Sequence, residues 1–344
     1  MSTPSRGSPS SRVAEGESSG VSGRKRPGMG SRIEVVTAGE TMVLGIPPQP
    51  GRLRHASHLE LKIGGAESNL AIALSRLGIS AGWISLLGKD ETGQLVLDRV
   101  RAEGVDTSRV RRIEGYPTGL YLRERLLTGG QVYYYRRGSA ASTMGPWAFD
   151  PEYLEGASLM HLTGITPALS EDCRSFTLWA ARVAREAGMR VSFDVNYRSK
   201  LWSPEKIRSF VGELLPYIDL LFVGDEEAYS LWGRDDENLV RELAALGPEE
   251  VVLKRGEAGS MALLEDSVLE QPGFDVPEVD SVGAGDAFNA GYIAGWLWGL
   301  ALEKRLYTAN AMGALSVATL GDYEGLPDEG ELQAFLEGEE ALGR

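Results

Sequence analysis

The sequence predicts an α/β protein of three layers, in which helices cover both faces of a mostly parallel central sheet. From residue 31 onward, short β-rich runs alternate with helical apolar patterns, which is typical of strands joined by crossover helices. Most of the strand-like runs are apolar throughout, as expected for strands buried on both faces. A pair of alternating segments in the first half of the chain predicts a second, smaller β-sheet outside the main one.

The elements of the main sheet are expected in a regular order. The first strand falls within residues 33–39. Further buried strands are expected at 83–87, 159–162, 191–193, 220–223 and 251–253. Helical spacing of apolar residues predicts helices at 70–77, 176–187, 207–215 and 287–302.

The small sheet is expected from segments 118–125 and 131–137, which are joined through a turn at 128–130. Residues 52–62 are expected to extend it. A sheet of this kind can cover an active site as a lid, although an ornamental excursion of the main sheet explains the same pattern.

We expect one domain over residues 31–340, with lid strands drawn from about 39–62 and 116–138. Three tyrosines, at 133–135, stand on an edge strand of the lid and are followed by two arginines. Exposed edges and aromatic side chains invite pairing with another chain. The sequence therefore predicts a homo-oligomer that assembles through the lid.

Composition excludes several classes of function. The 344 residues include 35 basic and 49 acidic side chains, a net charge of −14, and no basic stripe, which argues against nucleic-acid binding. The longest weakly polar run, 287–302, is shorter than the ~20 residues that cross a bilayer, so no membrane association is expected. Cys173 is the single cysteine and can form no internal disulfide, which fits the reducing cytoplasm.

Residues 1–30 are predicted to form a disordered tail. They are rich in Ser, Gly and Pro and show no apolar periodicity. They also lack the apolar stretch of ~7–15 residues that a secretory signal needs. Met29 stands just before the first predicted strand, so translation of the natural protein could begin there.

A Gly-Ala-Gly turn, Gly283–Gly285, directly precedes the apolar run at 287–302. Small residues at the start of a helix leave several backbone N–H groups free to bind an anion. Asp286 comes next, and its carboxylate would repel a phosphate unless it accepts a proton as a general base or works through a cation. The plainer alternative is that Asp286 caps the helix and the glycines serve only the turn.

A second glycine cluster, Gly64–Gly65, opens the helix expected at 70–77 and is followed by Asn69. Asparagine is a poor helix former unless its amide is used. Its carboxamide can bind sugar hydroxyls, which the glycines allow to approach the backbone.

Together, the two clusters resemble the two signature motifs of the ribokinase, or PfkB, family of carbohydrate kinases, over about residues 31–340. The resemblance implies a ribokinase-like fold, with ATP and Mg²⁺ as cofactors. It also implies that Asp286 is the base that deprotonates the acceptor hydroxyl, while the N–H groups of Gly283, Ala284 and Gly285 hold the transferring phosphoryl group. Such chemistry is mainly positioning and electrostatics.

Four segments, at 65–69, 121–124, 134–142 and 193–202, resemble the members of this family that phosphorylate 2-keto-3-deoxygluconate to the 6-phosphate. Arg136 and Arg198 suit such an acidic substrate, because a guanidinium fork pairs with a carboxylate. An exposed ion pair is the alternative for Arg198. The substrate-binding residues expected are Gly65, Ala66, Glu67, Ser68, Asn69, Tyr121, Tyr135, Arg136, Arg198, Asp286 and Asp322.

The resemblance also indicates a nucleotide site. Its expected residues are Asn196, Arg198, Lys254, Gly256, Gly259, Gly283, Gly285 and Asn310. Glu227 matches the glutamate of the family's Asn-x-x-Glu element, which is tied to Mg²⁺, and is expected to act on the metal indirectly. Gly224 replaces the asparagine of that element. Mg²⁺ is therefore expected to be held mainly by nucleotide phosphates and waters.

Two alternatives remain at the level of sequence. The acceptor could be that of another kinase of the family, namely 5-dehydro-2-deoxygluconokinase, fructokinase or ribokinase. The chain could also be a non-catalytic sugar-binding or regulatory protein on the same fold, although the intact Gly-Ala-Gly-Asp motif counts against this.

Overall fold

The structure is a computed structural model that describes residues 32–126 and 130–342. The tail expected at 1–30 and most of the turn expected at 128–130 lie outside the described residues. A nine-stranded main sheet and a separate four-stranded sheet make up the β structure of the described part. Three layers and a small second sheet are thus confirmed.

The main sheet has the strand order β13-β12-β11-β10-β9-β8-β1-β4-β5. All neighbours from β11 to β5 pair in parallel, whereas β12 pairs antiparallel with β11 and with β13. Each strand expected from the sequence is present. The strands are β1 (Val35–Ala38), β4 (Ala81–Gly88), β5 (Val110–Ile113), β8 (Leu159–Thr163), β9 (Arg190–Asp194), β10 (Leu220–Gly224), β11 (Glu250–Lys254), β12 (Ser260–Leu264) and β13 (Ser267–Gln271).

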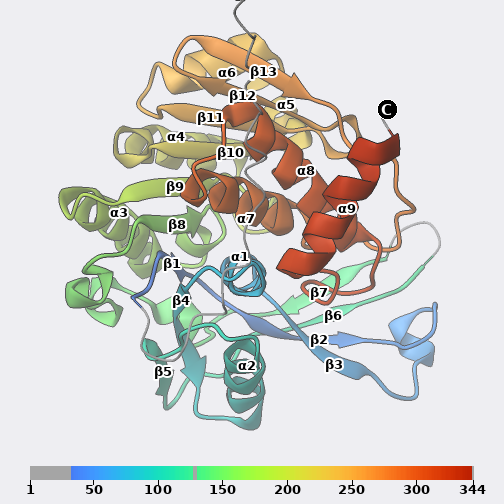
Figure 1. Ribbon diagram of the computed structural model, residues 1–344. Helices are drawn as coiled ribbons and strands as arrows, with labels where there is room; N and C mark the ends of the chain where they lie inside the picture. Colours follow the sequence, from blue (N-terminus) through green and yellow to red (C-terminus); the bar gives the residue numbers. More distant parts are fainter. Residues whose placement is uncertain (1–31, 127–129, 343–344) are drawn as a thin grey trace, which may run out of the picture.

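Two apolar clusters fill the space between this sheet and its helices, because successive strand residues point to opposite faces. One face carries α3 (Glu171–Glu186), α4 (Pro204–Leu214), α5 (Asp225–Trp232) and α6 (Glu237–Ala244). The other carries α1 (Ala66–Arg76), α2 (Glu91–Ala102), α7 (Ala284–Leu297), α8 (Leu302–Val317) and α9 (Glu329–Leu342). Figure 1 shows α1, α7 and α8 in front of the sheet.

The single helix expected at 287–302 is wrong at its end, because residues 298–301 interrupt it. Helix α7 ends at Leu297, and α8 begins at Leu302. Gly299 adopts a left-handed φ of 73°, and the N–H groups of Gly299 and Leu300 bond back to the carbonyls of Trp296 and Gly295. The apolar pattern continues across this break, so hydrophobicity alone did not indicate that the helix ends at this glycine.

The second sheet, called the lid sheet below, has the order β3-β2-β6-β7. Its strands are β2 (Met42–Ile46), β3 (Glu60–Gly64), β6 (Leu120–Arg123) and β7 (Val132–Tyr135). The strand expected at 52–62 is only partly correct: Leu53–His55 forms a 3-10 turn, and β3 begins at Glu60. Figure 1 shows the lid sheet projecting to one side of the main sheet, below α9.

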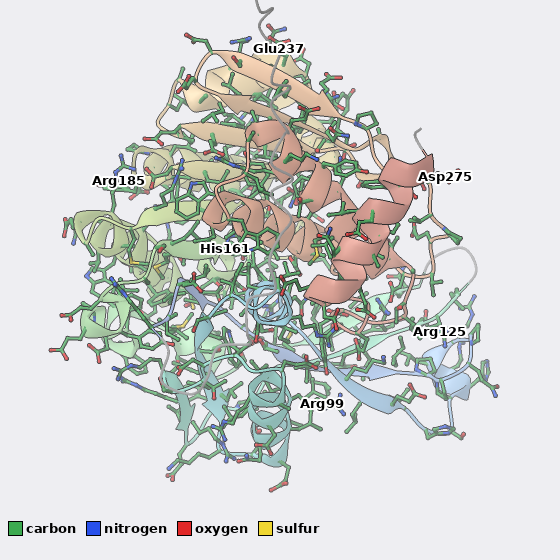
Figure 2. All side chains as sticks on the ribbon, in the orientation of Figure 1. Arg99, Arg125, His161, Arg185, Glu237 and Asp275 are labelled. Atoms are coloured by element: carbon green, nitrogen blue, oxygen red, sulfur yellow. The ribbon has the colours of Figure 1, made fainter. Side chains whose placement is uncertain are left out.

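Two further features bear on function. None of the described helices is long and apolar enough to cross a membrane. His161 lies in the main sheet (Figure 2), where its Nδ1 atom is 2.8 Å from Ser192 Oγ, and burial lowers the pKa of its imidazole to about 4. This histidine is therefore a neutral part of the core.

Candidate active site

Two cavities adjoin at the carboxyl ends of the parallel strands, where α7 begins. The central cavity, of about 550 Å³, lies between the lid sheet, α1 and the first turn of α7. The flanking cavity, of about 450 Å³, lies between the β11–β12 turn and helices α7 and α8. Lys254 and Gly285 line both cavities. Ligands of open parallel sheets bind at this edge.

The turn before α7 requires glycine at position 283. Gly283 has a left-handed φ of 85°, and a Cβ atom there would lie 2.0 Å from the carbonyl oxygen of Asp322. The first N–H groups of a helix have no acceptor within it. That of Ala284 reaches Ser281 O over a long 3.3 Å, so the start of α7 keeps donors for a ligand.

Asp286 lies in the first turn of α7, partly buried, and faces α1 across the central cavity. Its Oδ2 accepts a hydrogen bond from Asn69 Nδ2 at 2.9 Å. Burial raises the pKa of Asp286 to about 7, and the nearby Asp194 carboxylate raises it further, whereas the Asn69 bond opposes the shift. A carboxyl group with this pKa can take up a proton near neutrality and return it.

A buried ion pair lies beneath the junction of the two cavities. Lys254 Nζ donates to Asp194 Oδ2 at 2.7 Å, and Asn289 Nδ2 donates to the same oxygen at 2.6 Å. The lysine also lies beside α7, because a Cβ on Gly285 would be 3.4 Å from Nζ. A cation is thus fixed where the two cavities meet.

The central cavity is lined by acceptor oxygens that lack donors. Asn69 Oδ1, Asp194 Oδ1 and Asp322 Oδ1 are buried and have no hydrogen-bond partner within the described part of the chain. Burial raises the pKa of Asp322 to about 6, so this carboxyl is also poised to exchange a proton. Buried acceptors without partners are unfavourable unless a ligand brings hydroxyl donors.

The lid sheet supplies an aromatic wall. Tyr121 donates its hydroxyl proton to Asp322 Oδ2 at 2.7 Å and stacks on Tyr134, with ring centroids 5.7 Å apart. The expectation that Tyr135 lines this site is wrong. Side chains alternate along β7, so Val132 and Tyr134 face the cavity, while Tyr135 is 61% exposed and points the other way.

Three arginines reach the central cavity, in different electrostatic states. Arg136 is paired with the buried Glu40, which also accepts the Ser139 hydroxyl. Arg123 is paired with Asp280. Arg198 is exposed and makes no ion pair with a described carboxylate; its Nη1 donates to the carbonyl of Tyr197 at 3.2 Å. Arg198 is thus the arginine best able to receive an acidic group.

The comparisons with known proteins match this architecture. The model of the pfkB family of carbohydrate kinases matches residues 32–329. This chain belongs to the PfkB family. It is similar to the 2-dehydro-3-deoxygluconokinase of Bacillus subtilis, with 37% identity over 89% of this chain and 96% of the relative. It is also similar to the 2-dehydro-3-deoxygalactonokinase of Haloferax volcanii, with 38% identity over 87% and 95%.

Among solved structures, 2-dehydro-3-deoxygluconokinase from Thermotoga maritima aligns with a TM-score of 0.83 and 28% identity, covering 90% of this chain and 99% of that one. The ribokinase-like fold is therefore confirmed, and the protein is a sugar kinase that transfers a phosphoryl group. PfkB kinases use ATP with Mg²⁺.

Two of the residues expected to bind substrate lie behind the PfkB site. Glu67 and Ser68 are buried on the far side of α1, because a helix turns Ala66 and Asn69 toward the cavity and the two residues between them away from it. Glu67 Oε1 accepts hydroxyl protons from Thr163 and Thr166, and Ser68 bonds to Thr41. Gly65, Ala66 and Asn69 do line the cavity.

The residues expected to bind nucleotide divide between the two cavities. Gly256, Gly259 and Asn310 line the flanking cavity, where Asn310 Nδ2 donates to the carbonyls of Gln271 (3.1 Å) and Pro272 (3.0 Å). Asn196 and Arg198 line the central cavity instead. Asn196 has a φ of 39°, which asparagine tolerates better than most residues.

Glu227 faces the central cavity at the start of α5. Its two carboxylate oxygens accept the N–H groups of Tyr197 (2.8 Å) and Gly224 (3.1 Å), and burial raises the pKa of the carboxyl. Asp225 and Glu226 line both cavities. The described residues contain no group of three or more side chains that could by themselves hold a metal ion, so Asp225 and Glu226 could supply only part of a Mg²⁺ shell completed by nucleotide phosphates and waters.

Four residues at or beside the site were not predicted individually. Arg123, Tyr134 and Asp194 lie within segments that carry the family resemblance but were given no role, and Asn289 lies outside those segments. Period-two alternation in β6 was the available signal for Arg123, since Tyr121 implies that Arg123 shares its face. For Asn289, the sequence showed only a polar residue within an apolar helix. Its contact with Asp194 could not be predicted, because Asp194 lies 95 residues earlier in the chain.

Proposed function

We propose that this protein phosphorylates 2-keto-3-deoxygluconate, also named 2-dehydro-3-deoxygluconate, on its terminal hydroxyl with MgATP, forming the 6-phosphate. The observation that carries the proposal is the position of Asp286. It lies at the start of α7, at the junction of a cavity rich in unpartnered acceptors and a second cavity bordered by glycines. Relatives from Bacillus subtilis and Thermotoga maritima carry the matching name.

Asp286 is proposed as the general base. Asn69 holds the carboxylate by one oxygen, which leaves the other to accept the proton of the terminal hydroxyl. The freed oxygen then forms a bond to phosphorus while the bond to the leaving ADP breaks. Because the pKa of Asp286 is about 7, the group is ionised in a useful fraction near neutral pH.

The start of α7 is proposed to stabilise the charge on the transferring phosphoryl group. The N–H groups of Gly283, Ala284 and Gly285 are the donors, reinforced by the positive end of the helix dipole. Lys254, fixed by Asp194, adds a cation beside Gly285. ATP, when bound with Mg²⁺, supplies the phosphoryl group and the charge neutralisation that this arrangement needs.

The flanking cavity is proposed to hold the nucleotide. Gly256 and Gly259 border it without side chains, and Asn310 binds the backbone at 271–272, directly before the lining residues Gly273 and Phe274. Asp225, Glu226 and, indirectly, Glu227 would orient Mg²⁺, the remaining ligands being phosphate oxygens and waters.

The acidic end of the acceptor is proposed to bind Arg198. This guanidinium has no carboxylate partner among the described residues and lines the central cavity. Arg136 also lines it, but Glu40 already offsets its charge. Tyr121, Asn69 and Asp322 would bind the hydroxyls along the chain of the substrate.

The experiment is phosphorus NMR of a reaction containing the purified protein, MgATP and 2-keto-3-deoxygluconate. We expect one new phosphate monoester on the terminal carbon. The galactonate epimer is measured in parallel, since the relative from Haloferax volcanii is named for it. Efficient turnover of ribose or fructose, with none of either acid, would contradict the proposal.

We also propose that the chain acts in the cytoplasm as one kinase domain over residues 31–340, which the lid sheet covers.

Two copies are proposed to associate through the outer face of the lid sheet. Leu61, Gly45, Leu122 and Tyr133 form a row across its four strands, directly opposite one another in register. Leu61, Tyr133 and Tyr135 are exposed. An apolar row of this kind suits a second copy of the same face.

Light scattering tests this association. We expect a dimer for the wild-type protein and a monomer for the double variant Leu61→Glu/Tyr133→Glu. Tyr229→Glu, which changes an exposed tyrosine on α5 outside the lid sheet, is the control and should remain dimeric. A monomeric wild-type protein would refute the association.

A further inference from the structure

Arg123 and Asp280 are charged residues near the site to which the proposed mechanism gives no role. Arg123 ends β6 and lines the central cavity, and its side chain is 9% exposed. Its two Nη atoms contact the two carboxylate oxygens of Asp280. Asp280 lies three residues before Gly283. The pair therefore links the lid sheet to the turn that begins α7.

Asp280 also binds the segments on both sides of that turn. Its Oδ1 accepts the N–H of Val282 at 3.3 Å, and its Oδ2 accepts the N–H of Gly321 at 3.0 Å. Gly321 precedes Asp322, whose carbonyl oxygen is packed against Gly283. One carboxylate thus joins a lid strand, the turn before α7 and the loop at 321–322.

A second contact from the same strand reaches the same loop. Tyr121 and Arg123 are two residues apart and face the same side of β6. Tyr121 binds Asp322, and Arg123 binds Asp280. Displacement of β6 would break both contacts together, so the position of the lid and the restraint on the turn are coupled.

We propose that Arg123 is a positioning residue for phosphoryl transfer, which acts through Asp280 on the Gly283–Gly285 turn. The inference rests on the proposed function, in which this turn holds the phosphoryl group. With β6 in place, the guanidinium holds Asp280, and Asp280 holds the backbone that presents the N–H donors. Loss of either residue removes a restraint on this turn, so the N–H donors are held less precisely at the phosphoryl group.

The test is steady-state kinetics of Arg123→Met, Asp280→Asn and the double variant. We expect each single change to lower kcat about 10²-fold, the loss that follows from a misplacement of about 1 Å. KM for ATP and for the acceptor should change little. Because the two residues act as one unit, the double variant should lose no more than about the larger single loss.

The same three variants distinguish an effect on stability from an effect on the position of the turn. Each single variant leaves one buried charge unpaired, whereas the double variant leaves none. The double variant should therefore unfold at a higher temperature than either single variant, yet keep the low kcat. Arg123→Lys, which retains the charge without the fork, should recover part of kcat.

Arg125→Met is the matched control. Arg125 lies two residues further along the same chain segment, in the lid region that Figure 2 labels, and donates to the carbonyl of Pro48 at 2.6 Å without reaching the α7 turn. Its kcat should equal that of the wild-type protein. An equal loss in Arg125→Met would show that any weakening of the lid suffices and would overturn the role of Asp280.

Two other results would overturn the proposal in an active enzyme. One is an unchanged kcat in Arg123→Met. The other is an Arg123→Met variant in which only KM for the acid is raised, together with an Asp280→Asn variant whose kinetics are unchanged. That result would make Arg123 a ligand of the acceptor. If the wild-type protein phosphorylates neither acid, the proposed function fails, and hydrogen exchange decides this inference: amides 280–286 must exchange faster in Arg123→Met and Asp280→Asn, and unchanged protection refutes it.

Discussion

At the scale of single residues, the proposed role of Asp286 as general base predicts how the activity depends on pH. Burial raises the pKa of this carboxyl to about 7, and Asn69 binds the ionised form. We expect kcat/KM to rise with pH up to about 7 and then level off, because only the carboxylate accepts a proton. A profile that is flat across this range would remove Asp286 from the role of base.

Substitution tests the same group. Asp286→Asn should lower kcat about 10³-fold while acceptor binding, measured by calorimetry, is kept. The raised pKa also makes the native protein bind more protons than the unfolded chain between pH 3.8 and about 7, so this group lowers the free energy of unfolding as pH rises through that window. In urea unfolding, the free energy of unfolding of Asp286→Asn should decline less between pH 3.8 and about 7 than that of the wild-type protein.

Substitutions of Arg198 and of Arg136 are expected to have different effects, although both arginines were predicted from the sequence to bind the acid. Arg198→Met should raise KM for the acid by about 10-fold or more, the value of a charge-assisted hydrogen bond, with unfolding unchanged. Arg136→Met leaves Glu40 buried without its cation and should lower the free energy of unfolding by about 3–5 kcal/mol. Kinetics and urea denaturation of both variants check this, and a stable Arg136→Met protein would contradict it.

At the scale of elements, two helical glycines provide a matched pair. A Cβ at Gly291 in α7 would lie 2.7 Å from Met312 Cγ and 2.9 Å from Ala309 Cα, whereas one at Gly212 in α4 meets nothing within 4 Å. Gly291→Ala should therefore destabilise by about 1–3 kcal/mol. Gly212→Ala should stabilise by about 0.5–1 kcal/mol. Urea unfolding measures both, and stabilisation by both would show that α7 and α8 are not closely packed.

Local pattern was sufficient for elements whose periodicity is undisturbed. The buried strands and the start of α7 follow from apolar runs and from the Gly-Ala-Gly turn. The break at Gly299 and the 3-10 turn at Leu53–His55 did not follow, because each depends on a backbone conformation that apolar composition does not record. Glu67 illustrates the same limit within the site: its proximity to Asn69 in sequence suggested binding, but the rotation of the helix buries it.

At the scale of the whole molecule, the site is built from segments that the chain brings together over long distances. Asn69 meets Asp286 across 217 residues, and Tyr121 meets Asp322 across 201. The resemblance to a family indicated that these residues belong to one site, whereas their hydrogen-bonded pairing came only from the structure. What the structure adds is which arginines are already paired with carboxylates, and this pairing supports the proposal that Arg198 binds the acid.

The proposed selectivity for a 2-keto-3-deoxy acid is measured by the ratio of kcat/KM for 2-keto-3-deoxygluconate to that for fructose, with MgATP, in the wild-type protein and in Arg198→Met. We expect a strong preference for the acid that falls about 10-fold or more in the variant. A wild-type preference for fructose, or a ratio that the substitution leaves unchanged, would contradict it.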